Sequence, residues 1–240
     1  MRILAIGAHP DDIEFACGGV LLVEAARGSE ITLCICSRGE SGTNGTPEER
    51  EAEARRAAAL LGAKIEFLEL GGDCHFRLTN ENSFALARQI RLVRPDVLLS
   101  SVTSDDQHPD HAIVGKLARD AARFARYGGI AELRDLEPHS IGHQFEYAVT
   151  PGAEPRDRAR IRVDISEQYE KWIALMECHQ TQLRTRRYVE LQTARAHLLG
   201  IEAGVEYAQA LFAGDELLVR RLSELPASEA RLNEIGRAHV

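Results

Sequence analysis

The sequence lacks paired cysteines and has no surplus of positive charge. Its five cysteines are an odd number and none lies in a Cys-x-x-Cys pair, so they indicate reduced thiols rather than a disulfide framework. Lys and Arg number 29 against 37 Asp and Glu, which gives a net charge of −8. General nucleic-acid and anionic-membrane binders need a basic footprint, so the charge balance argues against both classes.

Long apolar runs are also missing. The longest, 57–61 and 172–176, are far too short for a membrane-spanning helix. Met1 and Arg2 lead directly into a strand-like segment, with no signal-peptide pattern, so we expect a cytoplasmic protein without membrane insertion. The 240 residues, 44% hydrophobic and 28% charged, are typical of a globular protein and predict a single domain over 1–240.

What is present is an alternation of strand-like and helix-like segments. Strands are predicted at 2–7, 31–36, 64–70, 96–102, 140–150 and 160–165. Helices are predicted at 15–27, 47–61, from 82 or 83 to before Pro95, at 111–126, at 167–187 and as a final set over 198–234. The second helix has the clearest ends, with Thr46 as N-cap, Pro47 at the first helical position and Gly62 after the last turn.

Repeated βα units predict the fold class α/β, a Rossmann-like doubly wound, mainly parallel sheet with helices on both faces. The core is expected over about 1–126, and a small C-terminal strand/helix extension over about 127–240. In doubly wound sheets the first strand commonly borders the fourth, and ligands bind beyond the carboxyl ends of the strands at that switch point.

Two clusters of His and Asp follow those two strands. Residues 8–14 read Ala-His-Pro-Asp-Asp-Ile-Glu, and residues 105–111 read Asp-Asp-Gln-His-Pro-Asp-His. Imidazole and carboxylate groups are suitable ligands for zinc or another divalent metal. A catalytic zinc site needs three protein ligands, and two from the first cluster with one from the second would supply them. Spacing alone leaves open whether His108 or His111 is the third ligand.

Each of these residues also has an ordinary structural interpretation. Asp11 or Asp12 could be a helix N-cap, and a lone histidine is more often a satisfied polar residue than a ligand. The Gly18-Gly19 pair is expected to allow close packing against a strand. No G-x-G-x-x-G follows the first strand, so a Rossmann cofactor site is not expected. The density of two clusters at one predicted edge nevertheless favours a shared metal site.

The two clusters resemble the signature motifs of the LmbE-like, or PIG-L, deacetylases, which are metal-dependent N-deacetylases of N-acetylglucosamine-containing substrates. The similarity extends to further short motifs along most of the chain. These are Arg38-Gly39-Glu40, the helix from Glu49 to Ala54, Val163-Asp164-Ile165-Ser166, Cys178-His179-Gln180-Thr181-Gln182 and Gly204-Val205-Glu206-Tyr207-Ala208.

The resemblance implies a role for each matching residue. His9, Asp12 and His111 would bind Zn²⁺, with another divalent metal such as Fe²⁺ as the alternative. Asp11 would be the general base that activates water. His108 would stabilise the oxyanion and protonate the leaving amine, with Asp110 orienting it. Glu40, Arg50 and Asp73 would contact the sugar or its substituent.

The implied function is therefore a zinc-dependent hydrolase that removes the N-acetyl group from an amino-sugar small molecule. One alternative is an amidase that cleaves a larger N-acyl group or a thiol conjugate with the same residues. Another is a non-catalytic sugar- or metal-binding module, which would predict the loss of at least one site residue, and none is missing. Asp106 stands where some mycothiol-type members have Tyr, which favours the bacillithiol or antibiotic-sugar branches. A homo-oligomer is compatible with the family.

Three residues near these motifs have only structural predictions. Cys74 is predicted to be a small packed residue, and His75 a loop residue near the rim of the pocket. His179 is predicted either to be partly buried at a helix end or to line the site.

Overall fold

The computed structural model describes residues 1–221 and 224–225, which build one seven-stranded sheet in the order β3-β2-β1-β4-β5-β7-β6. The strands are β1 (Arg2–Gly7), β2 (Glu30–Ile35), β3 (Lys64–Phe67), β4 (Val97–Ser101), β5 (His143–Tyr147), β6 (Arg160–Asp164) and β7 (Ala208–Ala213). From the edge strand β3 across β2, β1 and β4 to β5, neighbouring strands pair in parallel. Strand β7 is antiparallel to both of its neighbours, β5 and β6. The predicted α/β class with a mainly parallel sheet is confirmed.

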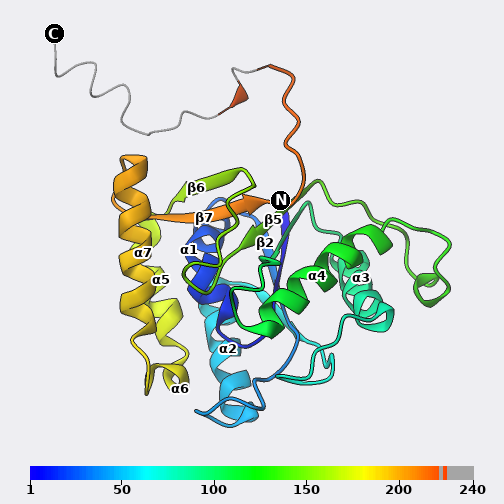
Figure 1. Cartoon of the computed structure of the whole chain (residues 1–240), viewed down its shortest axis with the longest axis horizontal. Helices are drawn as coiled ribbons and strands as arrows, with labels where there is room; N and C mark the ends of the chain where they lie inside the picture. The colour runs from blue at the N-terminus through cyan, green and yellow to red at the C-terminus, as the bar shows by residue number, and fades with distance from the viewer. Residues whose placement is uncertain (222–223, 226–240) are drawn as a thin grey trace.

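Helices cover both faces of the sheet (Figure 1). One face carries α1 (Asp12–Ala26), α2 (Pro47–Leu61), α5 (Tyr169–Glu177), the short α6 (Gln180–Leu183) and α7 (Tyr188–Ala203), and the other carries α3 (Asn80–Val93) and α4 (Pro109–Phe124). Short 3₁₀ turns lie at Ala131–Leu133 and Ser166–Gln168. Successive strand residues point to opposite faces, so Ile3 and Ala5 join the core under α1, whereas Leu4 and Ile6 join the core under α3 and α4.

The predicted ends of α2 are confirmed in atomic detail. The Thr46 hydroxyl accepts a hydrogen bond from the Glu49 N–H at 3.2 Å, and the Glu49 carboxylate accepts one from the Thr46 N–H at 2.9 Å. This reciprocal pair is a capping box, and it supplies partners for backbone groups that the helix cannot satisfy itself. The helix ends at Gly62, which has φ +74°, a conformation that glycine adopts without steric cost.

The prediction for the C-terminal segment was partly wrong. A final set of helices is predicted over 198–234, but α7 ends at Ala203 and Ala208–Ala213 forms β7. The reason is tertiary, because the Ala-rich sequence of β7 lies between β5 and β6, whose backbone hydrogen bonds outweigh its helix propensity. The predicted helix at 167–187 is also divided, into α5 and α6. Residues 222–223 and 226–234 of the prediction lie outside the described residues.

The packing of α1 and the surface of α7 both bear on the cavities described below. A Cβ added to Gly19 would lie 2.8 Å from the Gln209 side chain, so Gly19 lets α1 approach β7 closely, as expected of the Gly18-Gly19 pair.

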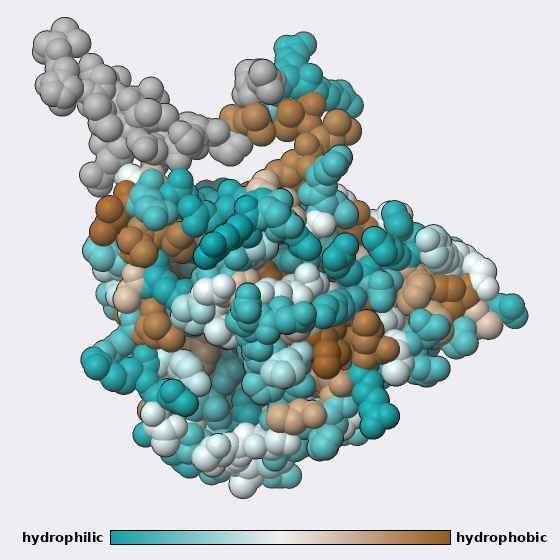
Figure 2. All heavy atoms as spheres, viewed as in Figure 1, coloured by the Kyte–Doolittle hydropathy of each residue, from teal (hydrophilic) through white to brown (hydrophobic). Residues whose placement is uncertain are grey.

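Figure 2 shows apolar surface over the C-terminal end of α7, where Leu198 and Ile201 are 59% and 63% exposed. Within residues 1–221 and 224–225, no helix combines the length and apolar character needed to cross a membrane.

Candidate active site

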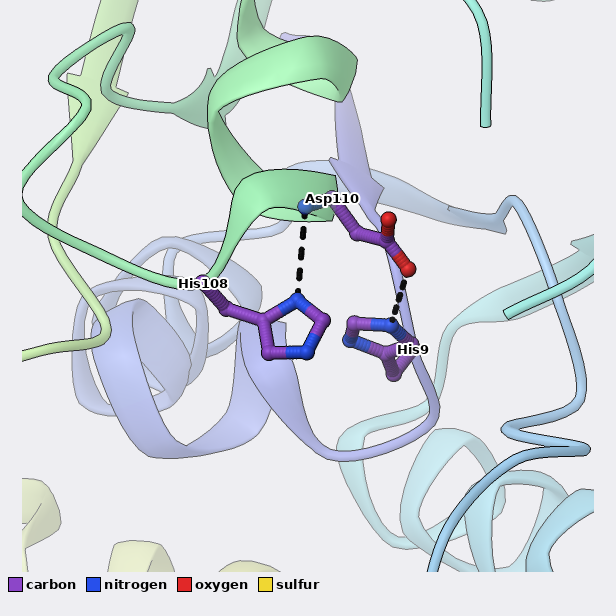
Figure 3. A group of neighbouring side chains, drawn as sticks. All are labelled: His9, His108 and Asp110. Atoms are coloured by element: carbon purple, nitrogen blue, oxygen red, sulfur yellow. Dashed lines mark hydrogen bonds and ion pairs between the residues drawn. The ribbon is translucent and has the colours of Figure 1, made fainter. Parts of the chain in front are cut away.

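The carboxyl ends of β1 and β4 lie side by side and bring the two His/Asp clusters together. The strands pair in parallel, with Ala5 opposite Leu99, so the segments that follow them leave the same edge of the sheet. His9 Nε2 and a carboxylate oxygen of Asp110, 101 positions apart in the sequence, are 3.1 Å apart (Figure 3). The predicted juxtaposition of the two clusters is therefore what the structure shows.

His9, Asp12 and His111 form one group of side chains that could hold a metal ion. One donor atom from each lies within 4.8 Å of the others, and all three residues are buried. Asp12 Oδ1 is 3.0 Å from His111 Nε2, and Asp12 Oδ2 is 3.5 Å from His9 Nδ1. Asp12 Oδ2 also accepts hydrogen bonds from the N–H groups of Ala8 and His9, which fix the carboxylate in place.

The other nitrogen of His9 faces two further carboxylates. Its Nε2 is 3.1 Å from Asp73 and 3.1 Å from Asp110. Burial lowers the pKa of His9, but the charge of Asp12 and hydrogen bonds with Asp110, Asp12 and Asp73 outweigh burial and raise the pKa well above its ordinary value. A carboxylate on one ring nitrogen commonly orients a histidine that binds metal through the other. The donor set therefore fits a divalent cation, and neutral imidazoles suit its binding.

Two other groups of potential ligands share residues with this one. His9, His108 and Asp110 form the second group, and Asp73, Cys74 and Asp110 form the third. In each of them one member is exposed, whereas the His9, Asp12 and His111 group is buried throughout. Within the described part of the chain, the buried His111 Nδ1 has no hydrogen-bond partner.

Asp11 stands at the N-cap position of α1 but does not cap it. Its side chain makes no capping hydrogen bond, and its φ of 111° lies in the left-handed region, which costs a non-glycine residue energy. Its carboxylate is 3.5 Å from the Arg50 guanidinium. Burial raises the pKa of Asp11 to about 6, with Arg50 lowering it and Asp12 raising it. The strained backbone holds the Asp11 carboxyl beside the group that could hold a metal ion.

His108 is the N-cap of α4, and its Nδ1 accepts a hydrogen bond from the Asp110 backbone N–H at 3.3 Å (Figure 3). In a neutral ring the proton is therefore on Nε2, where it can be donated. Burial and the positive charges of His9 and His111 lower the pKa of His108. The side chain is consequently suited to donate a hydrogen bond as a neutral imidazole.

The carboxylate of Asp110 points away from the ring of His108, which the sequence predicts it to orient. Its carboxylate accepts a hydrogen bond from the Cys74 N–H at 2.7 Å and faces His9. The reason is local, since the first turn of α4 directs the Asp110 side chain toward His9, while the Asp110 backbone N–H occupies His108 Nδ1. Cys74, predicted to be packed, is exposed and has φ +66°.

The three residues expected to contact the sugar occupy different places. Glu40 is exposed, and its carboxylate accepts hydrogen bonds from the N–H groups of Arg38 and Asp73, so it joins two loops. Arg50 is 4% exposed, and its guanidinium donates to the carbonyl groups of Gly39 and Pro10. Asp73 is buried against His9. Arg50 and Asp73 still line the cleft, and Glu40 does not.

The cleft above these groups has a volume of about 430 Å³. Its far wall comes from the segment after β5 and from α6 to α7, which sequence reasoning did not assign to the site. The wall residues are Val149, Thr150, Pro151, Gln182, Arg186, Tyr188, Leu191 and Gln192. Gln182 lies in the motif from Cys178 to Gln182, and the others carry no local signal, because only the tertiary fold packs α7 against α1 and β7.

His179 and Glu14 form a buried pair below the cleft. His179 Nε2 is 3.4 Å from a Glu14 carboxylate oxygen, and each side chain is 1% exposed. Burial lowers the pKa of His179, but the charge and hydrogen bond of Glu14 raise it above the ordinary value. Of its two predicted positions, His179 takes the buried one and does not line the cleft.

Comparison with known proteins agrees with this geometry. Residues 4–122, which contain both clusters, match the family described as PIG-L: GlcNAc-PI de-N-acetylase. A solved structure, that of a conserved protein from Thermus thermophilus, superposes with a TM-score of 0.82 and 30% sequence identity, covering 94% of this chain and 99% of that one. The chain belongs to the PIG-L family. It is thus a member of a family of deacetylases, hydrolases of amide bonds.

Relatives of this chain differ in what their names say they do. A 1D-myo-inositol 2-acetamido-2-deoxy-alpha-D-glucopyranoside deacetylase of Salinispora arenicola is 29% identical over 86% of this chain and 83% of its own length. A 4-oxalmesaconate hydratase of Pseudomonas putida is 27% identical over 73% of this chain and 71% of its own length. The family fold therefore accommodates both amide hydrolysis and the addition of water.

Proposed function

We propose that this protein removes the N-acetyl group from an N-acetylglucosamine-containing sugar or glycoconjugate, using a divalent metal held by His9, Asp12 and His111. The observation that carries the proposal is the buried donor group of these three side chains, with Asp11 beside it and the ring of His108 5.2 Å from that of His9. The deacetylase relative supports an amino-sugar substrate. Zinc is the proposed metal, with Fe²⁺ as the alternative, since His and carboxylate ligands suit both.

Asp11 is assigned both proton transfers. When bound, the divalent cation acts as a Lewis acid on the acetyl carbonyl and makes water more acidic. The Asp11 carboxylate accepts the proton of the attacking water and then delivers it to the leaving nitrogen. A nearby cation lowers the pKa of a carboxylate, so Asp11 is ionised and ready to accept a proton at neutral pH.

His108 is assigned the oxyanion. A neutral imidazole with its proton on Nε2 can donate a hydrogen bond to the oxygen of the tetrahedral species, and it does not need to give that proton up. A lowered pKa and the hydrogen bond to Nδ1 both support the neutral form. This division of labour assigns protonation of the amine to Asp11 rather than to His108. Asp110 and Asp73 are positioning residues that hold His9.

The test is an acetate-release assay on free N-acetylglucosamine, its disaccharide and glucosaminyl conjugates. Chelation should abolish release and added Zn²⁺ should restore it, whereas activity that resists chelation would refute the mechanism. Asp11→Ala should keep the metal and lose about 10²- to 10⁴-fold in kcat, the usual contribution of general acid–base catalysis. His111→Ala should lose metal and activity together, and equal metal loss in both variants would contradict the assigned roles.

Asp106→Ala provides a matched control, because Asp106 is exposed in the loop that precedes His108. It should retain metal and activity. Substrates with longer N-acyl groups, measured in the same assay, address the amidase alternative. The hydratase relative supplies a second reaction to measure. Hydration of that relative's substrate, without acetate release from any amino sugar, would replace the proposed function.

A further inference from the structure

A second cavity, open to solvent on one side, lies beside the active-site cleft and is lined by α1, α5, α7, β7 and the segment 152–160. Its volume is about 520 Å³, within the range of roughly 300–1,000 Å³ in which small-molecule sites fall. Its floor is apolar because aromatic and small side chains meet there from four elements. They are Ala16, Trp172, Ala196, Ala208 and Phe212. Alanine on α1, α7 and β7 leaves the space that larger core residues would fill.

Guanidinium groups surround this floor, and most of them have partners. Arg156, Arg158, Arg160 and Arg195 line the cavity, against the two carboxylates of Glu154 and Glu202. Arg195 pairs with Glu154 at 2.5 Å and Arg160 with Glu202 at 3.4 Å. Arg158 pairs at 2.5 Å with Glu146, a buried residue outside the lining. Among the described residues no hydrogen bond or ion pair engages the Arg156 side chain.

A wall of hydrogen bonds separates this cavity from the cleft. Gln192 lines both spaces, and its amide donates to the Val149 carbonyl at 3.2 Å. Arg195 donates to the same carbonyl at 2.9 Å and to the Gln192 side chain at 2.8 Å. Since every member of the wall is engaged, an occupant of the second cavity is a different molecule from the substrate in the cleft.

We infer that the second cavity binds a soluble small molecule with an anionic head group and an apolar or aromatic body. The local excess of guanidinium groups favours an anion even though the chain as a whole carries −8. Arg156 has the unengaged guanidinium that would meet a carboxylate, sulfonate or phosphate oxygen, as arginine does elsewhere. The body of the ligand packs on the partly exposed Pro155 and Leu199, above Trp172 and Phe212, whose fully buried side chains fix the floor. Trp172 is held by a hydrogen bond from its Nε1 to the Glu14 carbonyl at 2.8 Å.

Trp172 also makes the site measurable, because it is the one tryptophan in the sequence. The probe is 1-anilinonaphthalene-8-sulfonate, and N-phenyl-1-naphthylamine serves as its uncharged counterpart with the same aromatic body. We expect saturable energy transfer from Trp172 to the bound sulfonated probe. The Kd of the sulfonated probe should be lower than that of the neutral probe by about tenfold or more, the usual contribution of a hydrogen bond to a charged group. Equal affinity for the two probes would overturn the proposal.

Two variants locate the binding. Arg156→Glu, at an exposed position, should raise the Kd of the sulfonate by about tenfold or more and leave the neutral probe unchanged. Arg126→Glu is the matched control, since it makes the same charge change at an exposed arginine outside this cavity. Ala210→Leu, which adds volume to the lining, should weaken both probes. Equal effects of Arg156→Glu and Arg126→Glu would refute the assignment of the head group.

A second copy of the chain is the competing occupant, because the exposed Leu198 lies at the edge of the cavity. Sedimentation velocity on the same samples separates the two cases. If Leu198→Asp abolishes both self-association and the Trp172 signal, the cavity is an interface between copies and the proposal fails. Probe binding by a species of unchanged mass supports it. The readout is fluorescence, so the result does not depend on whether the protein deacetylates amino sugars.

Discussion

Replacing Asp11 with Asn should stabilise the metal-free protein at neutral pH. Asp11 is buried beside Asp12, and the attraction of Arg50 at 3.5 Å does not offset the loss of hydration. As a result, the pKa of Asp11 rises from 3.8 to about 6, which means that ionising this carboxylate opposes folding. Asparagine has the shape of the protonated form and also tolerates positive φ, so the substitution removes the charge without adding backbone strain.

The size of the effect follows from the two pKa values. A difference of about two pH units, at 1.36 kcal/mol per unit, gives about 3 kcal/mol. Below pH 3.8 both states hold the proton and there is no penalty. Between pH 3.8 and about 6 the unfolded chain has released its proton and the folded chain has not, so stability falls as pH rises. Above about pH 6 the full penalty is present, and Asp11→Asn removes it.

Urea unfolding in the presence of a chelator, followed by Trp172 fluorescence, measures the change. We expect Asp11→Asn to raise the free energy of unfolding by about 3 kcal/mol at pH 8 and by about half as much at pH 5. Asp106→Asn, at an exposed aspartate, should change it by less than about 0.5 kcal/mol. A gain of the same size at both pH values would show that charge is not the cause, and no gain at pH 8 would refute the reasoning.

Three further perturbations test the fold and the proposed metal site. Gly115→Ala should lower the Tm by an amount corresponding to about 1–3 kcal/mol, because its Cβ would lie 2.4 Å from the Ser101 carbonyl. Gly129→Ala, with open space around the new Cβ, should cost far less, and equal shifts in the two melting curves would contradict this reasoning. Thr46→Ala should cost about 1 kcal/mol in urea unfolding through the lost cap of α2, and Thr46→Ser should restore most of it; a serine variant as weak as alanine would argue against capping. Added Zn²⁺ should raise the Tm of the chelated wild-type protein and leave that of His111→Ala unchanged, so a rise in both would place the metal elsewhere.

The strands β1, β2 and β4 could be predicted because the interior of a parallel sheet is buried on both faces. Apolar runs such as 2–7 and 31–36 have no other stable position, and the capping residues around α2 fix its ends within a residue. The connection rules for βα units then place β1 beside β4, which brings the two clusters together before any coordinates are known. Local sequence and topology were sufficient to bring together the side chains of the proposed metal site.

Sequence was insufficient where the outcome depends on one long-range contact. The Ala208–Ala213 segment has helix-forming residues, and only the open edges of β5 and β6 make it a strand. A close approach of Arg50 to Gly39 likewise places its guanidinium 3.5 Å from Asp11. Neither contact leaves a periodic or local pattern in the sequence.

The orientation of Asp110 changes how the two clusters are understood. The motif places Asp110 two positions after His108, which suggests a pair within one cluster, but its carboxylate reaches across to His9 in the other. With Asp73 it occupies His9 Nε2, and this leaves Nδ1 on the side of Asp12 and His111. In the proposed metal site the second cluster would thus supply one ligand and also orient a ligand of the first, as a carboxylate does for many metal-binding histidines. Asp12, Asp73 and Asp110 meet around one imidazole, so the metal-free site has a local excess of negative charge that a divalent cation neutralises.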